Sequence, residues 1–147
     1  QIFRYADVLL MRAEALNEAN QGIQAPAEVY ERLRDIRRRA GLLAANDFGI
    51  PANMTKEDAR AFIQQERRLE FFMEEQRYWD VRRWKLAETE FNKDLLGMRI
   101  TKTGTNTYSY ERFTAGTINF EAPKMYMYPI PNIEVLRNPN LVQNIGW

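Results

Sequence analysis

Apolar residues recur at helical spacing through the first forty positions of the chain. The first stripe follows one face of a helix over residues 2–20, and its members are Ile2, Tyr5, Leu9, Ala13 and Leu16. A second stripe of the same period runs from residue 29 to residue 40, behind Pro26, which suits a first helical position. Two helices joined by a short connector predict an antiparallel helical hairpin over residues 2–40.

A longer helix is predicted over residues 56–88. Thr55 and Asp58 match a capping box that would start this helix near Lys56. At 3.6 residues per turn, apolar and charged residues share one arc of the helix, and further aromatic residues lie on the opposite side. A helix that is apolar on more than one side is usually central and buried. This segment is therefore expected to be the centre of the fold, with Trp79 and Trp84 in its core.

The charged residues of this helix are expected to form a shielded ion network with arginines from neighbouring helices. Buried charges persist only when they are paired and hydrogen-bonded. Arg12 interrupts the first apolar stripe and is predicted to reach the carboxylates of the central helix. The predicted members of the network are Arg12, Glu66, Glu70, Arg77 and Asp80.

Carboxylates spaced four residues apart have other uses, as a general acid and base or as metal ligands. The chain has no His and no Cys, and an arginine lies within two turns of each carboxylate. A nearby arginine keeps a carboxylate ionised, which suits a structural role better than proton transfer. A hydrolase that uses Glu66 and Glu70 is the weakest alternative. No catalytic residue, metal site or cofactor is expected.

From residue 95 the pattern changes to short alternating segments. Residues 98–102 and 107–113 alternate on either side of a turn at 103–106, which predicts a short β-hairpin or two extended segments. This β content is too small for a sheet-based fold. The predicted fold class is mainly α: a tetratricopeptide-like helical hairpin and a long central helix, with a small irregular or β-hairpin region at residues 95–147.

Size and charge exclude several classes of protein. The length of 147 residues is that of one domain. The 21 basic and 20 acidic residues give a net charge of +1, which argues against a nucleic-acid surface. The chain has no apolar run near 18 residues and no signal peptide. It begins within a predicted helix, so residues 1–147 are expected to be the C-terminal part of a longer protein.

Three segments, in the same order along the chain, resemble signature segments of the SusD/RagB family. They are RYADVLLMRAEA from Arg4, ERRLEF from Glu66 with the following Glu74, Arg77, Asp80 and RRW from Arg82, and YPIP from Tyr128 with NPNLVQN from Asn138. Ile145 and Trp147 replace the Pro and Tyr that are usual in the last segment. Each segment alone is moderately specific, and the three together are specific.

The resemblance implies a nutrient-binding lipoprotein on the outer membrane of Bacteroidetes-type bacteria. Such a protein would bind oligosaccharides or other nutrients without catalysis and deliver them to a SusC-like TonB-dependent transporter. Its membrane attachment would be a lipid anchor outside these residues. The alternative is a helical-repeat protein–protein interaction module from inside the cell, with a peptide as ligand. A secretory signal and a lipid-modified cysteine upstream would favour the first hypothesis.

Sugars are held by flat aromatic rings together with amide, carboxylate and guanidinium groups, and such groups concentrate on loops. Two sets of residues fit this description, and they are Asn46, Asp47 and Phe48, and Asn106, Tyr108 and Tyr110. For the two tyrosines, packing against the helices is the favoured alternative, because aromatic residues are mostly core residues.

Overall fold

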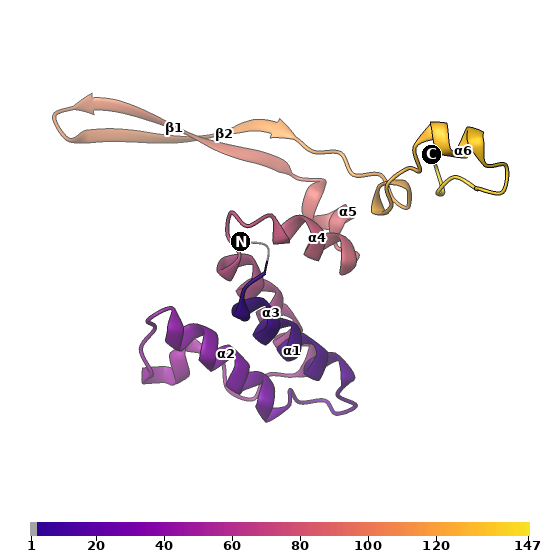
Figure 1. Cartoon of the computed structure of the whole chain (residues 1–147). Helices are drawn as coiled ribbons and strands as arrows, with labels where there is room; N and C mark the ends of the chain where they lie inside the picture. The colour runs from indigo at the N-terminus through magenta and orange to yellow at the C-terminus, as the bar shows by residue number, and fades with distance from the viewer. Residues whose placement is uncertain (1–2) are drawn as a thin grey trace. The chain divides into compact units, whose positions relative to one another are not determined.

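The first half of the chain is a small helical unit. The computed structural model describes residues 3–147, and the chain divides into a first unit of residues 1–77 and a second unit of residues 78–147. Helices α1 (Tyr5–Ala19) and α2 (Ala27–Arg39) form the expected helical hairpin, and α3 (Lys56–Glu70) packs beside α1 (Figure 1). The predicted start of the first helix at residue 2 lies outside the described residues.

The core of the first unit is formed by the apolar faces of these three helices. Its fully buried side chains include Leu10, Val29, Leu33, Ile36 and Ile63. Helix α3 begins with the predicted capping box: the Thr55 hydroxyl accepts a hydrogen bond from the Asp58 amide at 3.1 Å, and the Asp58 carboxylate accepts one from the Thr55 amide at 3.2 Å. Two backbone amides at the start of the helix, which have no partner within the helix, thereby gain a hydrogen-bond acceptor. The local sequence is therefore sufficient to place this helix start.

The helix expected over residues 56–88, in which the sequence weakly indicated a kink near residues 77–79, is instead interrupted at residues 71–75, and this corrects the prediction. Helix α3 is followed by a turn and then by two shorter helices, α4 (Gln76–Arg83) and α5 (Ala87–Phe91). Within the turn, Met73 and Glu75 have φ angles of 65° and 64°. A right-handed helix does not pass through residues in this region of backbone space.

The end of α3 is bound by an arginine from before α1. Arg4 donates hydrogen bonds from its guanidinium to the backbone carbonyl and to the carboxylate of Glu70, the last residue of α3. The last carbonyls of a helix lack partners within the helix, and cations favour that end. The helix therefore ends where a distant side chain satisfies its carbonyl, a contact that local sequence patterns do not reveal.

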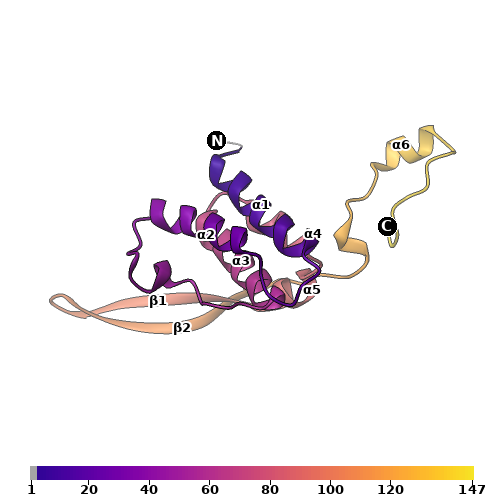
Figure 2. The same cartoon turned by 90° about the horizontal axis from the view of Figure 1, so that it is seen from below.

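The second unit contains a small helical core and a long β-hairpin. Residues of α4 and α5 pack with Phe120 and with the segment around residue 125, and the buried members of this cluster are Val81, Ala87 and Phe120. Strands β1 (Asp94–Gly104) and β2 (Thr107–Thr117) pair in an antiparallel two-stranded sheet, longer than predicted (Figure 2). A short helix, α6 (Asn132–Arg137), follows near the end of the chain.

The hairpin is exposed on both of its faces. Ile100 lies opposite Tyr110, and Gly97 lies opposite Phe113. A Cβ atom at Gly97 would come within 2.8 Å of the Phe113 ring, so the missing side chain lets this ring lie across the neighbouring strand. The predicted fold class, mainly α with a small β-hairpin, is confirmed. Within residues 3–147 no helix has the length and apolar character that crossing a membrane requires.

Candidate functional site

The loop between α2 and α3 contains a left-handed turn. Asn46, Asp47 and Phe48 have φ angles of 56°, 51° and 58°, and Gly49 follows at 73°. Left-handed backbone costs roughly 1–2 kcal/mol for each residue with a side chain. Three such residues in succession are kept in place only when surrounding contacts hold them.

Arginines of α2 supply those contacts. Arg34 donates from Nε and Nη2 to the two carboxylate oxygens of Asp47, at 2.6 and 2.8 Å. Arg37 donates from Nη1 to the carbonyl oxygen of Phe48 at 2.9 Å. Two arginines of the basic run 34–39, for which the sequence predicts a solvated or salt-bridged helix face, thus hold the turn from one side.

Arg37 is in turn held by a buried carboxylate of α3. Its Nη2 and Nε donate to one oxygen of Glu66, at 2.7 and 3.0 Å, and its guanidinium carbon lies 4.6 Å from the centre of the Phe62 ring. Glu66 is buried, with 8% of its side chain exposed. One of the predicted inward-facing carboxylates therefore braces the loop that carries Asp47.

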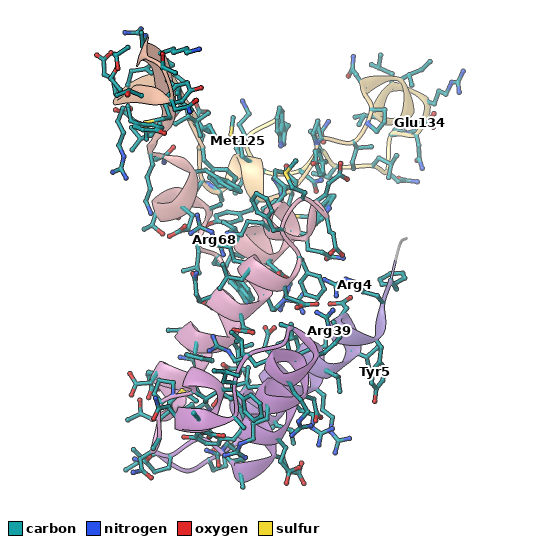
Figure 3. The ribbon with its side chains drawn as sticks, turned by 90° about the vertical axis from the view of Figure 1, so that its left-hand side faces the viewer. Arg4, Tyr5, Arg39, Arg68, Met125 and Glu134 are labelled. Carbon is teal, nitrogen blue, oxygen red and sulfur yellow. The ribbon has the colours of Figure 1, made fainter. Side chains whose placement is uncertain are left out.

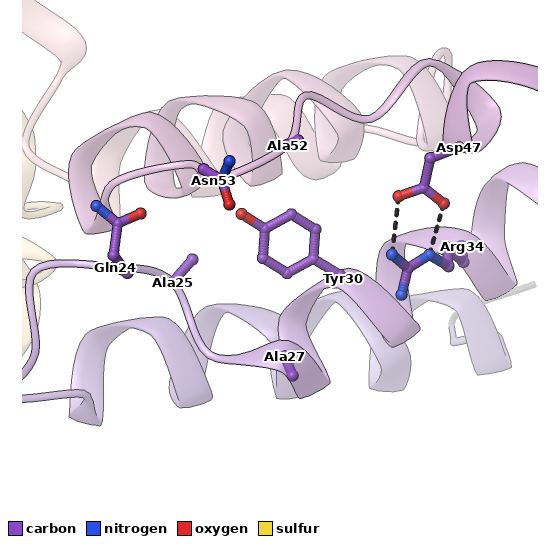
Figure 4. A pocket seen from close by; sticks show the side chains of 8 residues that line it. All are labelled: Gln24, Ala25, Ala27, Tyr30, Arg34, Asp47, Ala52 and Asn53. Carbon is purple, nitrogen blue, oxygen red and sulfur yellow. Dashed lines mark hydrogen bonds and ion pairs between the residues drawn. The ribbon is translucent and has the colours of Figure 1, made fainter.

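A cavity of about 380 Å³ opens beside Arg34 and Asp47 (Figure 4). Three segments form it: the connector between α1 and α2, the exposed side of α2, and the loop before α3. The lining residues are Gln24, Ala25, Ala27, Tyr30, Arg34, Asp47, Ala52 and Asn53. A cavity of this volume is within the range of sites for small ligands.

The walls of the cavity offer hydrogen-bond donors and acceptors next to an aromatic ring. The hydroxyl oxygen of Tyr30 accepts a hydrogen bond from the Met54 amide at 2.7 Å, which leaves its own O–H available as a donor. The guanidinium of Arg34 lowers the pKa of the Asp47 carboxyl, and burial opposes this only in part. The same hydrogen bond raises the pKa of Arg34. Both groups are therefore charged near neutral pH.

The structure places the second predicted set on the other unit. Asn106 is in the hairpin turn with a φ angle of 58°, and Tyr108 and Tyr110 follow it on β2. Both tyrosines are exposed, opposite Lys102 and Ile100 on β1. Of the six predicted binding residues, only Asp47 lines the cavity.

The predicted ion network is divided among separate partners. Glu70 accepts hydrogen bonds from both Arg4 and Arg39, which lie together at the end of α3 (Figure 3). Asp80 is buried and accepts from Arg83 on its own helix at 2.9 Å. Arg77 is half-buried in the first turn of α4.

Arg12 lies away from these carboxylates, which corrects the prediction for it. Its Nη2 lies 3.7 Å from Glu28 of α2, and 60% of its side chain is exposed. A buried charged residue of α1 that does face α3 is Asp7, which pairs with Arg67 at a distance of 3.0 Å. Asp7 lies three residues before the fully buried Leu10 and thus on the same helical face, but no spacing in the sequence identifies Arg67 as its partner.

Replacing Glu70 by alanine is expected to lower the free energy of unfolding by about 1.5 to 3 kcal/mol, the range for hydrogen bonds to charged groups. The effect stays below that of a fully buried pair because Arg4 keeps Glu74 as a partner and Arg39 is largely exposed. Urea unfolding measures the change. The control is Glu57→Ala, an exposed residue on the same helix. Equal effects of the two substitutions would contradict a structural role for Glu70.

Comparison with known proteins identifies the family of the chain. The model of the SusD family matches residues 1–147. The chain is 33% identical over 141 residues to SusD-like protein P2 of Formosa agariphila, and the matched region covers 96% of this chain and 24% of that protein. It is 42% identical over 89 residues to SusD-like protein P38 of the same organism, and the matched region covers 58% of this chain and 17% of that protein.

Solved structures agree with these matches. A SusD-like protein from Bacteroides fragilis NCTC 9343 superposes with a TM-score of 0.82 at 32% identity, over 99% of this chain and 25% of that one. A SusD homolog from Bacteroides thetaiotaomicron VPI-5482 gives a TM-score of 0.70 at 25% identity, over 99% of this chain and 26% of that one. This chain thus spans about a quarter of the length of its relatives. Because the family match extends along all of residues 1–147, and the three signature segments lie within it, the chain belongs to the SusD family.

Proposed function

We propose that the protein binds an oligosaccharide or another nutrient at the bacterial cell surface and delivers it to a SusC-like TonB-dependent outer-membrane transporter. Membership of the SusD family supports a nutrient- or glycan-binding role at the outer membrane. Attachment to that membrane would be through a lipid anchor outside residues 1–147. The ligand is bound and released, with no bond made or broken.

The observation that carries the proposal is the doubly hydrogen-bonded pair of Arg34 and Asp47 in the wall of the cavity. Adjacent hydroxyl groups of a sugar ring each donate and accept hydrogen bonds. A guanidinium beside a carboxylate offers a donor and an acceptor at matching spacing. Nη1 of Arg34 makes no hydrogen bond with the described residues and is available to a ligand oxygen.

The remaining walls of the cavity suit the same ligand. Tyr30 contributes a ring against which the C–H face of a sugar packs, and its O–H is a further donor. Gln24 and Asn53 add amide groups at the opposite side of the ring (Figure 4). A few polar groups converging around an apolar surface are the usual composition of a site for small molecules.

Asp47→Asn is expected to weaken oligosaccharide binding by about tenfold or more, because it removes the carboxylate that both accepts from a ligand hydroxyl and orients Arg34. Isothermal titration calorimetry with a panel of neutral hexasaccharides of glucose, mannose and xylose measures the effect. The matched control is Asp35→Asn, because Asp35 pairs with Arg32 and Arg38 on the outer face of α2.

Two results would count against the proposal. One is the absence of binding to every sugar of the panel by the unsubstituted protein. The other is an Asp47→Asn protein that binds as tightly as the Asp35→Asn control.

A further inference from the structure

The second unit exposes a group of aromatic rings on the surface of α4 and the C-terminal segment. We call this group, Tyr78, Trp79 and Tyr128, the aromatic platform. Trp79 and Tyr128 are 53% and 56% exposed, although Trp79 is expected in the core from its place in the sequence. Their ring centres are 6.2 Å apart with planes inclined by 55°, and Tyr78 meets Trp79 edge to face at 5.1 Å.

A buried arginine, Arg82, holds the two tyrosines of the platform in place. Arg82 donates from Nη1 to the Tyr78 hydroxyl at 2.9 Å and from Nη2 to the Tyr126 carbonyl at 2.7 Å. Its guanidinium carbon lies 5.1 Å from the ring centre of Tyr78 and 4.9 Å from that of Tyr128. The two tyrosine hydroxyls are joined by a hydrogen bond of 2.8 Å. The rings are thus held in place before any ligand arrives, which lowers the entropic cost of binding.

The C-terminal signature segment fixes the other side of the platform. Asn144 donates from its side chain to the Tyr128 carbonyl at 2.6 Å. Gln143 both donates to the carbonyl and accepts from the amide of Ile130, at 2.8 Å each. Two segments that are distant in the sequence, around residues 78–82 and 126–144, therefore converge on one exposed pair of rings.

We propose that Trp79 and Tyr128 stack against pyranose rings of a bound oligosaccharide and form a carbohydrate contact separate from the cavity beside Arg34. This inference rests on the proposed function for the class of ligand. Sugars combine a flat C–H face with hydroxyl groups at the edge, and the platform presents ring faces with polar groups at their edges. The indole Nε1 of Trp79 makes no hydrogen bond with the described residues, and the side chain is half exposed, so this N–H is a donor that a ligand oxygen could accept from.

The chemistry at the edges of the rings favours a sugar over a protein partner. Aromatic residues and arginine are also enriched in protein interfaces, whose central patch is apolar. Here the rings are linked by hydroxyl groups at their edges, and their planes are inclined to one another. Such an arrangement suits a narrow amphipathic chain, with sugar rings packed on aromatic faces.

Trp79→Ala and Tyr128→Ala are each expected to weaken binding of the best hexasaccharide of the panel by about tenfold, the effect of losing one well-packed aromatic contact. Isothermal titration calorimetry measures binding by the full chain. The control is Tyr5→Ala, which removes an exposed aromatic ring from α1. Trp79→Phe keeps a ring face without the N–H and is expected to give an intermediate affinity. Sugar binding is also expected to shift the tryptophan emission of the unsubstituted protein, but not that of Trp79→Phe.

The outcomes distinguish this inference from the proposed function. Weaker binding by the platform variants, with Tyr5→Ala unchanged, supports the platform. If the unsubstituted protein binds a sugar and the platform variants match Tyr5→Ala, the platform proposal is overturned and the proposed function stands. If the unsubstituted protein binds none of the sugars, both proposals fail. Thermal unfolding of each variant shows whether the fold is retained.

Discussion

Replacing Arg67 by methionine is expected to lower the free energy of unfolding by about 3 to 5 kcal/mol, the usual cost of breaking a buried ion pair. Arg67 and Asp7 link α3 to α1 at a distance of 3.0 Å, with only 3% and 6% of their side chains exposed. Methionine replaces much of the volume of the arginine stem, but it leaves the Asp7 carboxylate in a poorly solvated place without this partner. Urea unfolding followed by circular dichroism measures the change.

Two companion variants test the cause of this loss. Arg12→Met removes an arginine from the exposed pair with Glu28, and it is expected to change stability by less than about 1 kcal/mol. The double variant Asp7→Leu with Arg67→Met removes both charges and is expected to recover much of the stability, because apolar pairs often replace buried ion pairs without loss. An Arg67→Met protein as stable as the Arg12→Met control would show that the pair contributes little.

Replacing Glu66 by alanine is expected to reduce stability by about 3 to 5 kcal/mol and, separately, to weaken sugar binding. Stability falls because Arg37 loses the carboxylate that accepts two of its hydrogen bonds in a largely buried place. Binding falls because Arg37 also holds the carbonyl of Phe48, and without this contact the left-handed turn no longer fixes the Asp47 backbone. Urea unfolding measures the change in stability. Isothermal titration calorimetry without urea, where the protein is folded, measures the change in sugar binding.

The variant Glu66→Gln provides the matched comparison. It keeps the shape of the side chain and one acceptor oxygen but loses the charge, so its effects are expected to have the same direction and a smaller size. Unchanged affinity in a folded Glu66→Ala protein would show that the pairing of Glu66 with Arg37 is not needed to hold the turn. That result would separate the ion pairs of α3 from the proposed binding site.

Local patterns were sufficient for several elements of the fold, but not for the break that separates α3 from α4 and α5. The stripes of apolar residues predict α1 and α2, and the capping box at Thr55 predicts the start of α3. Alternation around a turn predicts the hairpin β1–β2. These features depend on residues within a few positions of each other, so they are readable along the chain. The inward position of Glu66 is of the same kind, because helical periodicity alone places it on the buried arc.

The partners of the buried charges were not predictable in this way. Arg12 and Asp7 lie less than two turns apart on α1, and only the packing of α1 against α3 decides that Asp7 faces inward to Arg67. The end of α3 depends likewise on Arg4, which is 66 residues away from Glu70. Neither contact has a sequence spacing that a motif could record.

The sequence by itself therefore determined α1, α2, the start of α3, the hairpin, the family and the burial of carboxylates along α3. The tertiary structure decided which arginine binds each carboxylate, the left-handed turn that places Asp47 beside Arg34, and the exposure of Trp79 on the aromatic platform. The physical reason is the separation along the sequence of the groups that interact. Periodicity and capping act between neighbours in the chain, whereas ion pairs, helix ends and strained turns depend on groups that meet only after the chain has folded.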